Sequence, residues 1–166
     1  MTPTKLDLPI RRGTSFEIEL VSQVKNYVYD PDVHNAPADL KRTHAENLAH
    51  YGYVYEYIDF ASIYDRAELV IRKPYTGVGD STPLLTITTP EEGVEQTLTV
   101  LELTDKSVKI GISPEDTAKM NFNTAIFELH LIIEEDLSDE EIRAGAMSQD
   151  EIDTLVYGNV AVTGDK

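Results

Sequence analysis

Short segments in which apolar and polar residues alternate set the strongest limit on what this chain can fold into. In residues 107–112 (SVKIGI), Val108, Ile110 and Ile112 alternate with polar or small residues. Residues 125–136 (AIFELHLIIEED) show the same spacing over a longer run. Successive side chains of a β-strand point to opposite faces, so both segments are predicted to be strands with one buried face.

The same alternation recurs along most of the chain between short segments rich in turn-forming residues. In residues 97–103 the apolar phase changes, which predicts a bulge or two short strands. The length of 166 residues suits a single domain, which we expect over residues 1–166. No strand–helix–strand unit repeats, which argues against a parallel α/β fold and favours a mainly β fold. The specific prediction is an immunoglobulin-like antiparallel β-sandwich of about seven strands with short helical insertions. The predicted strands are residues 14–21, 67–73, 83–89, 97–103, 107–112, 125–136 and 155–165.

The segment Ser-Pro-Glu-Asp-Thr at residues 113–117 separates two of these strands. Ser113 suits a helix N-cap, Pro114 suits the first helical position, and the two acids suit the positive end of the helix dipole. The group has no histidine beside it and no metal-ligand spacing. We therefore interpret it as a short helical crossover, with Ala118 and Met120 closing one end of the core.

Two segments interrupt the strand pattern and are interpreted as insertions, at about residues 23–56 and 135–153. In the first, residues 38–50 are loosely periodic and predict a short helix. In the second, Ser138 with Glu141 and Ser148 with Glu151 have capping-box spacing and predict two helix starts.

Tyrosines gather in the first insertion, and tyrosine is common at protein–protein interfaces because it is large, rigid and amphipathic. The alternative is that these side chains pack the insertion onto the domain. The predicted protein-contact residues are Tyr27, Tyr29, Tyr51, Tyr53 and Tyr55.

Composition argues against several classes of protein. Thirty acidic against fourteen basic residues give a net charge of -16, which repels nucleic-acid phosphates and anionic lipid. There is no cysteine, hence no disulfide, thiolate metal site or cysteine nucleophile. The N-terminal residues show no apolar signal-peptide core, and no apolar run reaches the roughly 20 residues that span a bilayer. We expect a protein made in a cytoplasm and not exported by a signal peptide.

Metal and catalytic patterns are weak. His44 and His50 are six residues apart and miss the helix-face spacing of metal ligands. The acidic loop at residues 30–39 lacks the EF-hand pattern, and a calcium site of another kind there stays open. No nucleophile elbow or phosphate loop is present. We therefore predict no catalytic residues, no metal site and no cofactor.

Four segments together resemble a known group of proteins. They are IRRGTSFEIELV, YIDFASIYDRAELVIRKP, SVKIGISPEDTAKMNFNTAIFELHLI and VYGNVAVTGD. Their order and spacing are similar to those of the immunoglobulin-like β-sandwich modules of tailed-bacteriophage virion proteins. The resemblance covers roughly residues 9–22, 57–134 and 154–165. The two insertions depart from it, since the family usually has a brief turn at the first of them.

The resemblance implies a structural role and supplies no catalytic residues. We expect a virion protein, assembled in the host bacterial cytoplasm, that serves as an adaptor of the tail, baseplate or neck. Its partners would be other virion proteins in a symmetric multi-copy assembly, without nucleic acid or membrane. The alternatives are a head decoration protein, a module that binds carbohydrate or a host surface, and an enzyme subunit or regulatory domain.

Overall fold

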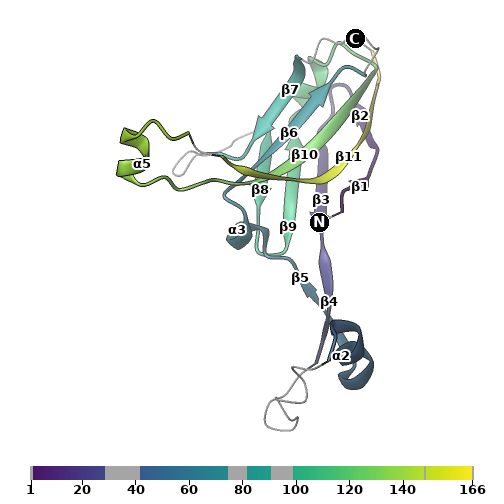
Figure 1. Cartoon of the computed structure of the whole chain (residues 1–166). Coiled ribbons are helices and arrows are strands. Elements are labelled where there is room, and N and C mark those ends of the chain that lie inside the picture. The colour runs from purple at the N-terminus through teal and green to yellow at the C-terminus, as the bar shows by residue number, and fades with distance from the viewer. Residues whose placement is uncertain (1, 29–41, 75–81, 91–98, 148, 166) are drawn as a thin grey trace.

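The computed structural model describes residues 2–28, 42–74, 82–90, 99–147 and 149–165 of the 166-residue chain. The fold is mainly β, with strands in three sheets and a few short helices (Figure 1). Sheet A has the spatial order β1 (Thr4–Lys5), β11 (Glu151–Thr163), β10 (Thr124–Ile133), β6 (Arg66–Arg72) and β7 (Pro83–Thr88), and β2 (Leu8–Arg11) also pairs with β11. Sheet B has the order β3 (Phe16–Val21), β9 (Ser107–Ile112) and β8 (Val100–Leu103). Sheet C contains only β4 (Gln23–Tyr27) and β5 (Tyr53–Tyr57).

Among the described residues, two strand pairs are parallel, namely β1 with β11 and β2 with β11. All the other pairs are antiparallel. The mainly β, largely antiparallel prediction is therefore confirmed. The described residues contain eleven strands where about seven were predicted. The missed strands are β1 and β2, which have only two and four residues, and β4 and β5, which show no alternation of buried and exposed positions.

Sheets A and B enclose one apolar core, and together we call them the body. Leu69, Ile71 and Leu129 of sheet A are fully buried, as are Leu101 and Val108 of sheet B. The predicted inward positions of β9 are confirmed, since Val108, Ile110 and Ile112 are all buried. The spacing of apolar residues in the sequence therefore identified the buried face of this strand correctly.

The segment after β9 forms α4 (Pro114–Ala118), which leads into β10. The Ser113 side chain accepts a hydrogen bond from the Asp116 backbone N–H at 3.2 Å, so the predicted cap is confirmed. Met120 is buried as expected, but Ala118 is exposed and its predicted place in the core is wrong. Thr117 takes that place, because its hydroxyl donates to the Thr14 carbonyl at 2.7 Å and this bond removes the cost of burial.

A buried arginine ties this end of the body together. Arg12 is only 8% exposed, and its guanidinium donates to the carbonyl oxygens of Met120 (2.7 Å), Phe122 (2.6 Å) and Gly164 (2.8 Å). It also donates to Oδ1 of Asn123 at 2.9 Å. One side chain thus joins the N-terminal strands, the segment after α4 and the end of β11.

Two projections leave the body in different directions (Figure 1). The first, which we call the arm, consists of β4, α2 (His44–Tyr51) and β5, and it ends at α3 (Phe60–Ile63) on the body. The second carries α5 (Asp139–Arg143) between β10 and β11. The predicted helix over residues 38–50 is shorter and begins later, at His44, and its first residues lie outside the described part of the chain.

The two helix starts predicted in the second projection have different outcomes. Ser138 and Glu141 form the predicted capping box at the start of α5. The start predicted at Ser148 and Glu151 is wrong, because Glu151 opens β11 and pairs with Ile133 of β10. Pairing with the long neighbouring strand overrides the local helix signal there, and Ser148 itself lies outside the described residues.

Candidate interaction surface

The arm is a two-stranded ribbon with solvent on both faces. Every residue of β5 is exposed, and β4 is exposed at its first three positions. In the antiparallel register Lys25 lies opposite Tyr55, and Tyr27 lies opposite Tyr53. Directly opposite residues share a face, so one side of the ribbon collects aromatic side chains. We call this side the tyrosine face, and it consists of Gln23, Lys25, Tyr27, Tyr53, Tyr55 and Tyr57.

Contacts within the tyrosine face hold its side chains in place. The Lys25 ammonium lies 3.7 Å from the ring centroid of Tyr53, a cation–π contact. The rings of Tyr53 and Tyr55 meet edge to face, with centroids 5.7 Å apart. Tyr53, Tyr55 and Tyr57 are nevertheless 54%, 56% and 54% exposed, so a large aromatic area faces solvent.

The other predicted tyrosines have a different place. Tyr27 and Tyr51 are partly buried, and their ring centroids are 6.0 Å apart. Arg42 donates to the Tyr51 hydroxyl at 2.8 Å, and the Tyr27 ring also contacts the His44 ring of α2. These two tyrosines therefore build the junction between α2 and the ribbon. Tyr29 lies outside the described residues.

The structure also reveals contact candidates that the sequence analysis missed. Tyr57 extends the tyrosine face by one position, and Lys25 supplies its cation. Val24 and Val54 are 49% and 44% exposed on the opposite face of the ribbon. The signal was the alternation in YVYEY, where tyrosine occupies every second position of β5. Because Val54 is apolar and lies between two tyrosines, the sequence of β5 did not show one apolar and one polar face.

The outward face of sheet B is acidic and hollowed at its centre. Glu19 lies opposite Lys109, which in turn lies opposite Glu102. In the next row, Gly111 lies between Glu17 and Val100 and contributes no side chain. A cavity of about 440 Å³ opens over these residues. We call this surface the acidic face, and it consists of Glu17, Glu19, Val100, Glu102, Lys109 and Gly111.

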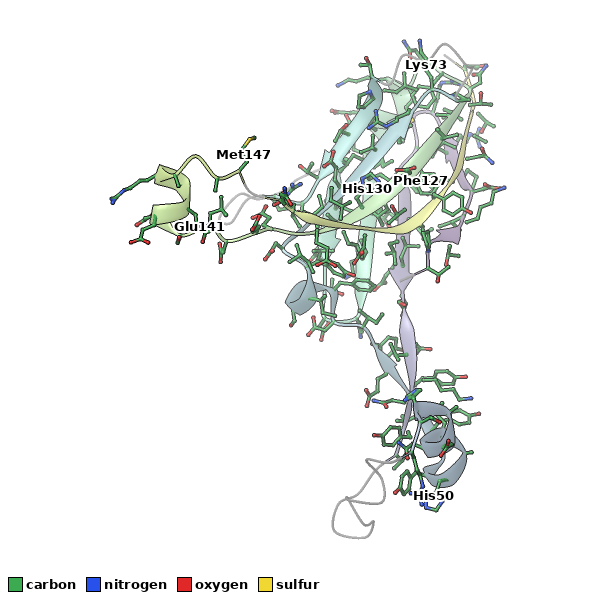
Figure 2. All side chains as sticks on the ribbon, viewed as in Figure 1. His50, Lys73, Phe127, His130, Glu141 and Met147 are labelled. Atoms are coloured by element: carbon green, nitrogen blue, oxygen red, sulfur yellow. The ribbon has the colours of Figure 1, made fainter. Side chains whose placement is uncertain are left out.

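The second projection also exposes apolar side chains. None of the α5 residues is buried, Ile142 is 58% exposed, and Met147 is 86% exposed. Figure 2 shows Glu141 and Met147 on this projection, well away from the body, with His50 at the far end of the arm. Single exposed apolar residues are ordinary on protein surfaces, but here they lie on segments that the body does not cover.

Chemistry-bearing groups are few in the described part of the chain. No cluster of three or more metal-ligating side chains occurs there, and the acidic loop at residues 30–39 lies outside it. His130 contacts the Glu128 carboxylate at 2.7 Å, on the surface of sheet A. No helix among the described residues is long and apolar enough to cross a membrane.

Within the part of the chain that the structure describes, Tyr64 has a perturbed pKa. Burial, a 2.9 Å hydrogen bond that the Tyr64 hydroxyl donates to Asp153, and the negative charge of Asp153 and Glu151 together raise the pKa of Tyr64 to about 12. A tyrosine held neutral in this way is a structural donor and is no candidate for a base near neutral pH.

Among the described residues, the candidate functional surfaces are therefore the two projections and the acidic face. No protein-family model and no curated protein matches the sequence.

Proposed function

We infer that the chain is a non-catalytic structural protein of a bacteriophage virion, which joins neighbouring subunits through its projections. The observation that carries this proposal is the exposed tyrosine face of the arm. A two-stranded ribbon is at best marginally stable by itself in water. An arm of this kind gains most when a partner protein covers it, and tyrosine is a favoured anchor for such contacts.

The finer description of the fold belongs to the same proposal. Two sheets that enclose one core, with largely antiparallel strands, are compatible with an immunoglobulin-like β-sandwich. The four motifs that resemble phage modules supply β3, β6, the β9–α4–β10 unit and the end of β11. The body then acts as a spacer, and the arm and the α5 projection act as adaptors.

Within the virion we favour the tail, baseplate or neck, with head decoration as the alternative. The partners are other virion proteins in a symmetric multi-copy assembly, built in the bacterial cytoplasm. The net charge of -16 disfavours nucleic acid and anionic membranes as partners. It favours basic protein surfaces instead.

The direct test is mass spectrometry of purified phage particles from cells that express the chain. We expect the chain to be a stoichiometric component, and its absence from the particles would refute the proposal. A second test compares Tyr55→Ser with Tyr157→Ser. Tyr157 is 43% exposed but lies on β11 of the body, so it serves as a matched control. Only Tyr55→Ser is expected to lower incorporation, with both variants folded.

The exposed tyrosines also favour one alternative, because aromatic rings can serve as platforms for sugars. A glycan array separates the two functions. Specific glycan binding that is lost in Tyr55→Ser, together with absence from particles, would replace the structural proposal by a carbohydrate-binding one. A structural protein is expected to ignore glycans and to co-purify with particles.

A further inference from the structure

The tyrosine face and the acidic face form one continuous surface. Only Ser22 separates β3 from β4, and its carbonyl accepts from Ile58 N–H at 2.9 Å. The pairing of the arm therefore reaches Ser22, directly after the last β3 pair with β9, Val21 with Ser107. Figure 1 shows β4 prolonging β3 away from the body. The odd-numbered residues of both strands are exposed from Glu17 to Lys25, with Val21 52% exposed at the centre, and the run ends at Tyr27, which is partly buried against α2.

The two halves of this surface have complementary chemistry. The tyrosine face offers hydrogen-bond donors, namely the tyrosine hydroxyls, and its single charged residue is Lys25. The acidic face offers the carboxylates of Glu17, Glu19 and Glu102 around a single lysine. Among the described residues, Lys25 and these three glutamates form no ion pair with a partner within 4 Å. A surface with donors at one end and acceptors at the other is self-complementary when one copy is reversed on another.

Gly111 supplies an independent observation. Glycine in the middle of a strand weakens it, and usually marks a bulge or the close approach of another group. Gly111 has no positive φ, its register with both neighbours is regular, and an added Cβ would come no closer than 4.0 Å to its nearest neighbour, Val100 Cβ. The isolated fold therefore gives no reason for glycine, and the cavity above it is open to an incoming side chain.

We propose that two copies of the chain pack face to face about a two-fold axis near Val21, so that the tyrosine face of each covers the acidic face of the other. A residue at a given distance before Val21 in one copy then lies over the residue at the same distance after Val21 in the other copy. Lys25 lies over Glu17 of the second copy. Tyr55, opposite Lys25, lies over Gly111, opposite Glu17, and its ring fills the cavity.

The size of the surface suits a modest dimer. The outward stripe from residue 17 to residue 27 is about 36 Å long, and two to three strands give it a width of roughly 12 Å. The flat footprint is about 430 Å² per copy, or about 900 Å² in total, which is the size of weak and transient interfaces. Area alone does not set affinity, and for a contact of this transient class we expect a dissociation constant of about 1–100 µM.

The dimer rests on the proposed function for its place in a multi-copy assembly. The dimer and the structural role are nevertheless refuted by different results. A monomeric chain found in particles would overturn the dimer and leave the structural role. A chain that dimerises but is absent from particles would overturn the structural role and leave the dimer.

The test is sedimentation equilibrium of the full chain, 18.6 kDa as a monomer, at concentrations around the expected dissociation constant. Lys25→Glu and Glu17→Lys are each expected to raise that constant at least tenfold, and the double variant to restore it to within about threefold. Gly111→Val fills the cavity with a strand-favouring side chain and is expected to raise the constant tenfold while the thermal midpoint stays level or rises. A monomeric wild type, or a double variant as weak as the single ones, overturns the proposal.

A photo-crosslinking experiment does not depend on variants that dissociate the dimer. A benzophenone amino acid at position 55 is expected to attach to the segment around Gly111 of the other copy. Mixed isotope-labelled and unlabelled chains identify crosslinks between copies by mass spectrometry. Crosslinks confined within one copy, or directed to sheet A, contradict the geometry.

Discussion

Replacing Arg12 by methionine should destabilise the body strongly, because one side chain satisfies four acceptors there. The carbonyl of Met120 accepts in a buried position and loses its donor, which costs about 1–3 kcal/mol. The other three acceptors are only partly buried, so water can replace the guanidinium at about 0.5 kcal/mol each. The expected loss in unfolding free energy is about 2.5–4.5 kcal/mol. Arg12→Lys should recover part of it, because lysine keeps the charge without the fork of donors.

Urea denaturation with linear extrapolation measures this loss. Arg11→Met is the matched control, because this substitution removes the same charge one residue away, at an exposed position of β2. Its expected effect is within about 0.5 kcal/mol. Equal losses for the two variants would refute the reasoning, because they would show that charge, and not the set of bonds to carbonyl groups, determines the effect.

Three further outcomes follow from side chains elsewhere in the body and in α5. Tyr64→Phe should flatten the pH dependence of the urea midpoint between about pH 10 and 12. In the wild type the pKa of Tyr64 is raised from 10.0 in the unfolded chain to about 12 in the folded one, so its contribution to stability is complete below pH 10.0 and is lost as the pH rises through about 12. Wild type and variant with parallel profiles would contradict this. Leu129→Ala, at a fully buried site, should cost about 3–5 kcal/mol in the same unfolding assay, and a loss below 1 kcal/mol would mean that the core is not packed there. Ser138→Ala should abolish protection of the α5 amides in hydrogen exchange but leave the global unfolding free energy unchanged within about 0.5 kcal/mol; a global loss would show that α5 supports the body.

The strands of the body were predictable from the sequence where one face of the strand is buried and the other is exposed to solvent. This holds for β9, in which the apolar spacing directly identified Val108, Ile110 and Ile112 as buried. The same reasoning fails for β4 and β5, because both faces of these strands are largely exposed and buried positions do not alternate with exposed ones. The crossover helix was predictable, because its Ser cap and Pro are local signals.

The rest depends on partners far apart in the sequence. Arg12 bonds to groups more than 100 residues away, and no local pattern announces them. The protein-contact role of the tyrosines stays a prediction. Only the structure distinguishes Tyr53 and Tyr55, which are exposed, from Tyr27 and Tyr51, which pack together at the α2 junction. Gly111 read as an ordinary strand residue until its two cross-strand neighbours were known.

The passage of one strand from β3 into β4 has a mechanical consequence. A pull on the arm along its length loads the six residue pairs between β3 and β9 at the same time, because the force runs parallel to the strand. The hydrogen bonds of this ladder are perpendicular to the strands, so they resist such a load together in shear instead of opening one after another. A sideways pull would instead peel the pairs apart from Val21 onward. The attachment of the arm through β3 is therefore expected to be stiff along the arm and compliant across it.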